Sequence, residues 1–450
     1  MIPNIFKAYD IRGLVGSELT KQFAFSTGVA FAKFLELERE PATVVIGEDM
    51  RPSSPELADA FSAGVTSQGL DVIRIGLAST DMLYFAAGKL NLPGAMFTAS
   101  HNPAEYNGIK LCLSGARPIG KESGLLTIEK FVREGVPVSL RPVGKENTQE
   151  MLTQYVDYLL SLVDISGIRK LNIVVDAGNG MAGHTAPAVF KWMNVDVTEM
   201  FYELDGTFPN HEANPIDEEN LQDLKKMVKA KKADIGLAFD GDADRCFLVD
   251  EKGNSVNPSL LTALIAEREL KKKPGSPIIY NLISSRAVRE VVEENGGKPL
   301  RSRVGHSFIK AMMAESGAIF GGEHSGHFYF ADFWRADSGM LAALHAIAAL
   351  GETDKTLSEL FAPYARYFAS GEINSKVSDS AAIMAQIKES YGARPGVTTD
   401  ELDGLTVDGD TWWFNVRASN TEPLLRLNVE AKTQGQMEAL RDEVLAAIRG

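Results

Sequence analysis

The sequence of 450 residues has only two cysteines and no long run of apolar residues. Cys112 and Cys246 both stand in apolar, strand-like segments, which favours buried free thiols over a disulfide or a metal pair. The longest apolar stretch, residues 340–350, contains His345 and is too short to span a bilayer, so it predicts a buried helix. The first residues carry charge early and lack a long apolar run, and we therefore expect no signal peptide.

Positive charge is also scarce, because 46 lysine and arginine residues stand against 60 aspartate and glutamate residues, and the net charge is −14. A field of this sign repels a phosphate backbone, which argues against a nucleic-acid partner. It would also repel a small phosphorylated ligand unless a few arginines and lysines are placed around it. With 44% hydrophobic and 24% charged residues, the chain is neither disordered nor fibrous. We expect a cytoplasmic protein of about three domains, with two to four allowed, and no membrane partner.

A unit of secondary structure occurs three times along the chain. In each copy a β-branched strand ends at a polar turn, a helix and a second strand follow, and a later strand runs into a loop. The predicted segments are 43–49, 55–68, 71–75 and 94–100 in the first copy; 172–176, 186–193, 195–201 and 234–239 in the second; and 277–281, 287–294, 299–304 and 318–321 in the third. Short apolar strands that alternate with helices indicate parallel or mixed α/β sheets.

Three loops fall at equivalent places after the last strand of each copy, at residues 98–103, 240–245 and 322–327. In open α/β sheets ligands bind beyond the carboxyl ends of strands, so three domains that turn these ends toward one cleft would bring the loops together. Three of the seven histidines lie in these loops, namely His101, His324 and His327.

The segment after about residue 369 is built differently. Predicted strands at 372–377, 412–416 and 424–431, with helices at 381–391 and 436–448, indicate a smaller α+β domain. We therefore predict an α/β protein with three similar mixed α/β domains in tandem and a smaller C-terminal α+β domain around a central cleft. The predicted domains are residues 1–146, 147–254, 255–367 and 368–450.

Three carboxylates, Asp240, Asp242 and Asp244, alternate directly after an apolar strand. Carboxylates this close repel one another unless a cation neutralises them, and all-oxygen ligation suits Mg²⁺ or Ca²⁺. An EF-hand is excluded although Glu251 falls at its twelfth position, because Arg245 stands where that loop needs glycine. The loop therefore predicts a metal site. The same pattern also suits an aspartyl-phosphate nucleophile at Asp240.

Ser100 is followed by His101 at a predicted strand end, where a serine can act as a nucleophile or carry a phosphate. A serine in such a place is more often an ordinary turn residue. The Gly-x-Ser-x-Gly elbow expected of a Ser-His-Asp hydrolase is absent. Arg12 and Lys110 flank the segments of this domain and are candidates for neutralising a phosphate, with plain surface charges as the alternative.

Two turns have rival interpretations. Residues 417–423 offer the Arg417 guanidinium and three short polar side chains between two strands, which matches a phosphate clamp; a plain polar hairpin is the alternative. Residues 178–183 fit the Gly-x-Gly-x-x-Gly pattern of dinucleotide sites. These glycines serve equally well in a tight strand-to-helix turn, which is the interpretation we favour.

Five motifs together resemble the bacterial phosphomannomutase/phosphoglucomutase family of the α-D-phosphohexomutases. They are residues 6–13, 98–103, 240–245, 322–327 and 417–423; they come in the family's order, and the match covers the whole chain. The family has four domains around a central cleft, in agreement with the repeat. The resemblance implies an isomerase that interconverts hexose 1-phosphate and hexose 6-phosphate, of mannose or glucose or both, through a phosphoserine and a hexose 1,6-bisphosphate.

The resemblance also implies roles for individual residues. Ser100 matches the serine that is phosphorylated, and Mg²⁺ is expected on Asp240, Asp242 and Asp244 together with a phosphoserine oxygen. The groups expected around the transferring phosphate are Ser100, His101, Arg12, Lys110 and Arg245. The residues expected to bind the sugar phosphate are Tyr9, His306, Glu323, Ser325, His327, Arg417, Ser419, Asn420 and Thr421.

The resemblance leaves several points open. Near Ile283 relatives often carry a basic residue that reaches the ligand, whereas the position here is apolar, so mannose and glucose remain alternatives. His324 fits this subfamily better than the phosphoglucosamine one, where glutamine is usual. A monomer and a homodimer are both compatible with the sequence. The rival functions are a phosphatase or transferase that uses Asp240 as nucleophile and a non-catalytic sensor of sugar phosphates.

Overall fold

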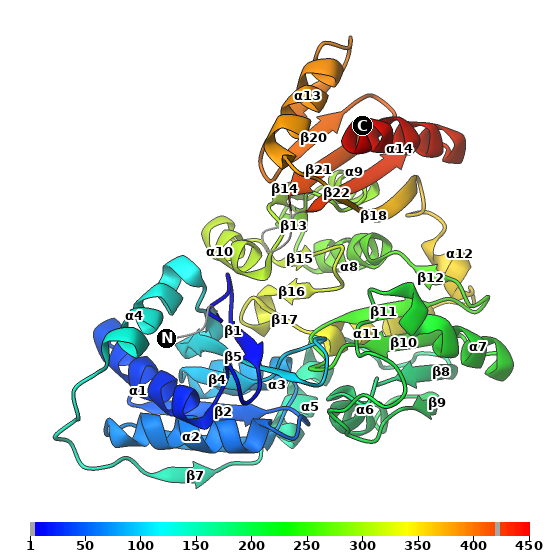
Figure 1. The fold of residues 1–450 in the computed structure, drawn as a ribbon. Helices are drawn as coiled ribbons and strands as arrows, with labels where there is room; N and C mark the ends of the chain where they lie inside the picture. Colours follow the sequence, from blue (N-terminus) through cyan, green and yellow to red (C-terminus); the bar gives the residue numbers. More distant parts are fainter. Residues whose placement is uncertain (1–4, 419–423) are drawn as a thin grey trace. The chain divides into compact units, whose positions relative to one another are not determined.

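The structure is a computed structural model that describes residues 5–418 and 424–450, without the side chain of His306. Figure 1 shows the path of the chain. The chain forms two compact units, Met1–Pro258 with Ser325–Leu360 and Ser259–His324 with Phe361–Gly450. Among the described residues no helix is both long and apolar enough to cross a membrane.

The first unit begins with one mixed sheet. Its strands are β1 (Ile11–Leu14), β2 (Thr43–Glu48), β3 (Asp71–Leu77), β4 (Gly94–Phe97), β5 (Tyr106–Leu113), β6 (Arg117–Pro118) and β7 (Glu146–Thr148). The sheet order is β1-β5-β4-β2-β3-β7, with β6 beside β5. The helices of this part are α1 (Lys21–Glu38), α2 (Ser54–Ser67), α3 (Thr80–Leu90) and α4 (Leu126–Glu134), with the short turns η1 (Ser114–Ala116) and η2 (Lys121–Leu125).

A second sheet of the same unit has the order β12-β11-β10-β8-β9. Its strands are β8 (Leu171–Asp176), β9 (Val195–Met200), β10 (Ile235–Phe239), β11 (Cys246–Val249) and β12 (Ser255–Val256). The helices around it are α5 (Leu152–Leu162), α6 (Ala182–Phe190), η3 (Glu218–Leu221) and α7 (Gln222–Lys231). The unit also contains the antiparallel strands β16 (Phe328–Phe330) and β17 (Ala336–Asp337), η4 (Ala331–Phe333) and α11 (Gly339–Gly351), and α12 (Leu357–Phe361) starts at its end.

The second unit contains a parallel group and an antiparallel sheet. The parallel strands are β13 (Pro277–Asn281), β14 (Lys298–Ser302) and β15 (Phe320–Gly322), with helices α8 (Pro258–Lys272), α9 (Arg286–Glu294) and α10 (His306–Ser316). The antiparallel sheet has the order β18-β22-β21-β20-β19. Its elements are β18 (Phe368–Lys376), β19 (Thr398–Asp400), β20 (Leu405–Asp408), β21 (Trp412–Ala418) and β22 (Leu424–Ala431), with α13 (Ser380–Gly392) and α14 (Gln434–Arg449).

The predicted threefold repeat is confirmed by the strand order. β2 lies between β3 and β4, β8 between β9 and β10, and β13 between β14 and β15, and all of these pairs are parallel. The last strand of each copy therefore adjoins its first strand, and the carboxyl ends of both meet at one sheet edge. The predicted fold class of three similar α/β domains and a smaller α+β domain is confirmed.

Some details of the prediction are confirmed and others are wrong. Both cysteines are buried with free thiols, and the predicted apolar helix is α11, whose residues are all buried. β4 ends at Phe97 rather than at residue 100, because the chain turns there into a left-handed backbone at Ser100. Helix α6 begins four residues before its predicted start, because the tight turn at residues 177–181 leads directly into it.

Two glycines allow α1 and α2 to pack with their backbones in contact. A Cβ atom on Gly28 would lie 2.2 Å from the carbonyl oxygen of Phe61, and one on Gly64 would lie 2.2 Å from that of Phe25. Any larger residue would push the helices apart. This packing fixes α2 and with it the turn between β2 and α2, which carries Arg51.

Candidate active site

Ser100 stands in the turn after β4, and its backbone is left-handed, with a φ of 51°. That conformation costs a residue with a Cβ atom roughly 1–2 kcal/mol, so the surrounding structure must hold it in place. The Ser100 N–H donates to Thr98 Oγ1 at 2.9 Å, and only 1% of the residue is exposed. The strand end therefore holds the serine in a strained and buried turn.

The aspartate loop after β10 meets this serine. Ser100 Oγ donates to Asp240 Oδ2 at 2.8 Å. A Cβ atom on Gly241 would lie 2.4 Å from the Ser100 carbonyl oxygen, so the two loops can approach this closely only with glycine there. Asp240, Asp242 and Asp244 are buried, and one carboxylate oxygen of each lies within 4.8 Å of the others. The structure thus brings the predicted serine and the predicted metal ligands together.

Lys110 on β5 contacts two of these carboxylates. Its Nζ lies 2.7 Å from Asp242 Oδ2 and 2.6 Å from Asp244 Oδ2. Burial by itself would raise the pKa of both carboxyls, but Lys110 outweighs burial, so the pKa of Asp242 is lowered and that of Asp244 falls to about 2. Burial likewise opposes the charge of Lys110, yet the two carboxylates raise its pKa well above the usual value. Lys110 thus lies at the aspartate loop, and its place at the transferring phosphate stays a prediction.

Asp240 receives less compensation than its two neighbours. Burial, followed by the charges of Asp244 and Asp242, raises the pKa of Asp240 well above its usual value. Asp242 Oδ1 and Asp244 Oδ1 are buried and accept no hydrogen bond from any described residue. Buried carboxylate oxygens without a hydrogen-bond donor are suited to bind a cation. The donor set contains only hard carboxylate oxygens and therefore fits Mg²⁺ or Ca²⁺.

Arg245 joins two histidines. Its Nη2 lies 2.8 Å from His101 Nδ1, and its Nε donates to His327 Nε2 at 3.2 Å. Because a guanidinium only donates, the ring nitrogens that face it accept, which assigns the protons to His101 Nε2 and His327 Nδ1. The Arg245 charge, burial and Arg12 hold the pKa of His101 well below its usual range. His327 Nδ1 lies 3.0 Å from Ser325 Oγ, so these two predicted residues are in contact.

Arg12 on β1 is fixed by two side chains. Its guanidinium donates to Asn102 Oδ1 and to Asp10 Oδ2, each at 2.5 Å. Asn102 belongs to the same loop as Ser100, so Arg12 is tied to that loop. Tyr9 precedes Asp10 and is half-buried.

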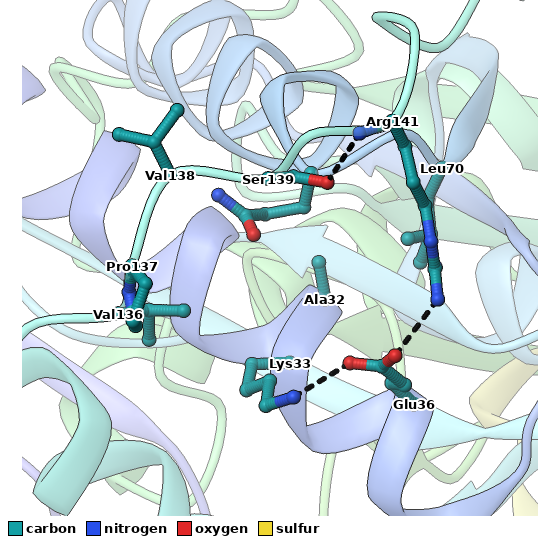
Figure 2. Close-up of a pocket in the computed structure, with 10 residues that line it drawn as sticks. Ala32, Lys33, Glu36, Leu70, Val136, Pro137, Val138, Ser139 and Arg141 are labelled. Carbon is teal, nitrogen blue, oxygen red and sulfur yellow. Dashed lines mark hydrogen bonds and ion pairs between the residues drawn. The ribbon is translucent and has the colours of Figure 1, made fainter.

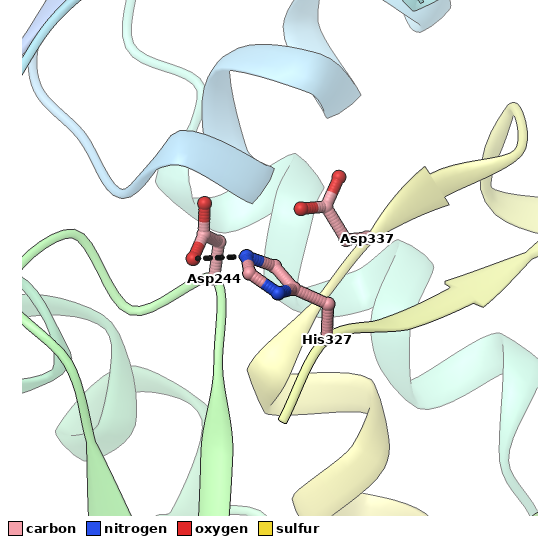
Figure 3. Close-up of side chains that lie close together, drawn as sticks. All are labelled: Asp244, His327 and Asp337. Carbon is pink, nitrogen blue, oxygen red and sulfur yellow. Dashed lines mark ion pairs between the residues drawn. The ribbon is translucent and has the colours of Figure 1, made fainter. Parts of the chain in front are cut away.

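A second group of metal-ligating side chains shares Asp244 (Figure 3). One ligand atom each of Asp244, His327 and Asp337 lies within 4.8 Å of the others. The loop after β10 supplies Asp244 and β17 supplies Asp337, and His327 Nε2 lies 3.6 Å from Asp244 Oδ1. This nitrogen already accepts from Arg245. The all-carboxylate group is therefore the better site for a hard cation.

Glu323 belongs to the second unit and follows β15 directly. It is buried, and its Oε1 accepts from the N–H of Gly305 at 3.1 Å and from Asn281 Nδ2 at 3.4 Å. Asn281 is the last residue of β13. The loop after the third strand is thus tied to the end of the first strand of the same copy. His306 begins α10, and its side chain lies outside the described part of the structure.

Arg417 lies on β21, directly opposite Arg426 of β22. Each guanidinium lies 3.3 Å from one oxygen of Glu372, and no described residue accepts from the Nε of either arginine. Two guanidiniums that share one carboxylate leave one positive charge for an anion. The predicted partners of Arg417 in the clamp, Ser419, Asn420 and Thr421, lie outside the described residues.

Ile283, at the position where relatives often carry a basic residue, is buried. It packs in an apolar cluster with Leu282 and Trp413, and Val304 lies against this cluster. The position is therefore used for packing between the parallel strands and the antiparallel sheet of the second unit.

Sequence reasoning missed several supporting residues. Thr80 Oγ1 donates to Asp242 Oδ2 at 2.5 Å, and nothing in the sequence marks it. Arg51 and Arg426 were missed as well, although Arg51 stands two residues after the acidic end of a repeated strand.

Within the turn at residues 178–183, a Cβ atom on Gly180 would lie 2.6 Å from the Gly241 carbonyl oxygen. This turn therefore supports the aspartate loop, in agreement with the structural interpretation of its glycines.

One cavity lies apart from these residues (Figure 2). It has a volume of about 250 Å³ and none of the predicted site residues lines it. Its walls come from α1, the end of α2 and the segment at residues 136–141, and include the ion pairs of Glu36 with Lys33 and Arg141. The geometry of the cavity does not connect it to the serine or the aspartates.

Family models match four consecutive parts of the chain. The descriptions are phosphoglucomutase/phosphomannomutase alpha/beta/alpha domain I for residues 3–136, domain II for 153–253, domain III for 257–367 and the C-terminal domain for 372–447.

Individual relatives resemble the whole chain. A phosphomannomutase of Escherichia coli is 40% identical over 456 residues, and the alignment covers 99% of both chains. A phosphoglucomutase of Neisseria gonorrhoeae is 37% identical over 99% of this chain and 96% of its own. The crystal structure of a phosphoglucomutase/phosphomannomutase family protein from Burkholderia thailandensis has a TM-score of 0.91 and 32% identity, over 100% of this chain and 98% of that one.

Proposed function

This chain belongs to the phosphoglucomutase/phosphomannomutase family and is a hexose-phosphate mutase, and we propose that it works through a phosphoserine at Ser100. The substrates proposed are the 1-phosphates and 6-phosphates of mannose and glucose, because its relatives are named for both sugars. The aspartyl-phosphate alternative and the non-catalytic sensor are not favoured by this membership.

One observation carries the proposal, which is the 2.8 Å hydrogen bond from Ser100 Oγ to Asp240 within a buried group of three aspartates. Phosphoryl transfer depends mainly on positioning and on neutralising charge. A serine at the edge of a cation site, with Arg245 and Arg12 nearby, supplies both. The serine comes from the first domain and the aspartates come from the second.

In the proposed reaction, phosphoserine 100 transfers its phosphoryl group to the free hydroxyl of a hexose monophosphate. The bond from phosphorus to Ser100 Oγ breaks and a bond from phosphorus to the sugar oxygen forms, while the sugar hydroxyl loses its proton and Ser100 Oγ gains one to become a hydroxyl again. The resulting hexose 1,6-bisphosphate then reorients, and its other phosphoryl group is transferred to Ser100. The same bisphosphate would activate unphosphorylated enzyme by the second half of this cycle.

Mg²⁺ is the proposed metal, held by Asp240, Asp242, Asp244 and a phosphoserine oxygen. When bound, it would supply positive charge that stabilises the transferring phosphoryl group. Lys110 and Thr80 orient Asp242 through its Oδ2 and leave Oδ1 available. Arg245 offers N–H donors close to Ser100 and His101, where charge develops during transfer.

Sugar binding is assigned to the remaining predicted residues. Glu323 is proposed to hold sugar hydroxyls through the carboxylate that Gly305 and Asn281 orient. Ser325 and His327, which contact each other, are also proposed to bind sugar hydroxyls. Tyr9, His306, Ser419, Asn420 and Thr421 complete the proposed set.

The test of the function is a comparison of kcat/KM on mannose 1-phosphate, glucose 1-phosphate and glucosamine 1-phosphate, with Mg²⁺ and glucose 1,6-bisphosphate supplied. We expect turnover of the first two and at most weak turnover of the third. Absence of turnover on both mannose and glucose 1-phosphate would contradict the proposal.

Arg417→Lys tests the proposed clamp on the phosphate that does not react. A contact made equally in the ground state and the transition state raises KM when it is lost, with a smaller change in kcat. A single ammonium cannot reproduce the two-pronged guanidinium, so we expect a loss of roughly 1–3 kcal/mol for both the 1-phosphate and the 6-phosphate. Steady-state kinetics in both directions, with released bisphosphate quantified, measures this.

Arg426→Lys is the matched comparison, because Arg426 shares Glu372 with Arg417 from the opposite strand. A smaller rise in KM is expected there, because Arg426 is not in the predicted motif. A collapse of kcat in Arg417→Lys with KM unchanged in both directions would place Arg417 at the transferring phosphate instead.

A further inference from the structure

Arg51 lies in the turn between β2 and α2, about fifty positions before the Ser100 loop in sequence, and its side chain is fully buried. It donates four hydrogen bonds to backbone carbonyls, three in that loop and one at Tyr106, where β5 begins. Nη1 donates to the carbonyl oxygens of Pro103 and Tyr106, each at 2.9 Å, and Nη2 donates to those of Ser100 at 2.9 Å and Asn102 at 2.7 Å.

The guanidinium is itself held from two sides. Asp49, the residue after β2, lies with Oδ2 3.3 Å from Arg51 Nε and accepts from the Arg51 N–H through Oδ1 at 3.0 Å. The ring of Phe208 covers the guanidinium at 5.1 Å. A Cβ atom on Gly206 would lie 2.5 Å from the Arg51 Cα, so the second domain packs directly on this residue.

We infer that Arg51 is the positioning residue of the nucleophile, in that its four hydrogen bonds hold the loop in the conformation that aims Ser100 Oγ at the aspartate group. Ser100 has a left-handed backbone that it would not adopt freely, and the carbonyl of Ser100 itself is one of the four acceptors. A planar guanidinium with several donors in fixed directions can define four carbonyl positions at once, which no other side chain can do. The inference rests on the proposed function, because it concerns the serine that carries the phosphoryl group.

Within the described part of the chain, the Arg51 side chain bonds to Asp49 and to the four carbonyl oxygens, and it bonds neither to the Ser100 hydroxyl nor to a residue proposed to bind the sugar. Its loss should therefore reduce the rate of phosphoryl transfer and leave the KM for sugar phosphate unchanged. Displacement of a reacting group by about 1 Å costs on the order of 100-fold in rate, and this is the effect expected for Arg51→Lys, which keeps the charge beside Asp49 but loses the fork.

The experiment measures single-turnover transfer from glucose 1,6-bisphosphate to dephosphorylated enzyme, with phosphorylation of Ser100 followed by mass spectrometry. A merely structural role would lower the melting temperature and the fraction of enzyme that reacts. A positioning role lowers the rate constant of the whole population. Arg74→Lys is the matched control, because Arg74 is a partly buried arginine on β3 of the same sheet, and its guanidinium pairs with the side chains of Glu48 and Asp59.

The result expected is a rate constant about 100-fold lower in Arg51→Lys, with full amplitude, unchanged KM and a normal rate in Arg74→Lys. If Arg51→Lys does not fold, Asp49→Asn decides, because it removes the ion pair and keeps an oxygen for the Arg51 N–H; it should also slow transfer. If the variant that folds transfers the phosphoryl group at the wild-type rate, the inference about Arg51 is wrong, whereas the proposed function is unaffected. Wild-type enzyme labelled at a residue other than Ser100 overturns the proposed function together with the inference.

Discussion

Ser100→Ala is expected to reduce mutase activity by at least about a thousandfold, the scale of losing a covalent catalytic group. The substitution removes the hydroxyl that lies 2.8 Å from Asp240 and that is proposed to carry the phosphoryl group. It also removes the phosphoserine oxygen proposed to complete the metal site. The measurement is conversion of glucose 1-phosphate to glucose 6-phosphate with Mg²⁺ and bisphosphate in excess.

Ser62→Ala is the matched control for this loss. Ser62 is a buried serine of α2 whose hydroxyl donates to Glu146. We expect its replacement to affect stability more than activity. Near-normal turnover by Ser100→Ala, with bisphosphate supplied, would refute the phosphoserine mechanism, whereas loss of activity with an intact melting temperature would support it.

Asp242→Asn is expected to require at least about tenfold more Mg²⁺ for half-maximal activity or to abolish activity, the scale on which metal sites respond to loss of supporting groups. The change removes one charge and one hard oxygen donor. It also places an amide beside Lys110 and Thr80, both of which donate hydrogen bonds to Asp242 Oδ2 in the unsubstituted protein. Activity as a function of Mg²⁺ concentration, together with Mg²⁺ binding by calorimetry, measures the shift.

Asp337→Asn distinguishes the two groups that share Asp244. If Mg²⁺ is held by the three aspartates of the loop after β10, Asp337→Asn should change the Mg²⁺ requirement much less than Asp242→Asn. If Asp242→Asn needs no more Mg²⁺ than the wild type, the aspartate loop does not bind the metal. If only Asp337→Asn needs much more Mg²⁺, the metal binds at the neighbouring group that contains His327.

The sequence by itself determined the repeated architecture and the chemical types in the three loops. Apolar strands that end in polar turns define the repeat. Where a buried strand ends, its backbone N–H and C=O groups need hydrogen bonds from water or from polar side chains, and a polar turn provides them. Asp240, Asp242 and Asp244 indicated a metal site because three adjacent carboxylates are unstable without a cation. Ser100 was a candidate because of its place at a predicted strand end, and its role as the phosphorylated serine came from the family resemblance; the sequence did not indicate its left-handed backbone.

Only the tertiary structure decided which side chains support these loops. Arg51, Thr80 and Lys110 reach the site from other strands and turns, and an arginine, a threonine or a lysine in a sequence does not say which carbonyl or carboxylate it will meet. In the folded chain the first strand of each copy ends beside the loop of the last strand. Arg51 therefore reaches the Ser100 loop, and Asn281 reaches Glu323, through contacts between the ends of parallel neighbours that are distant in sequence. Sheet pairing sets these distances, and sequence spacing does not encode them.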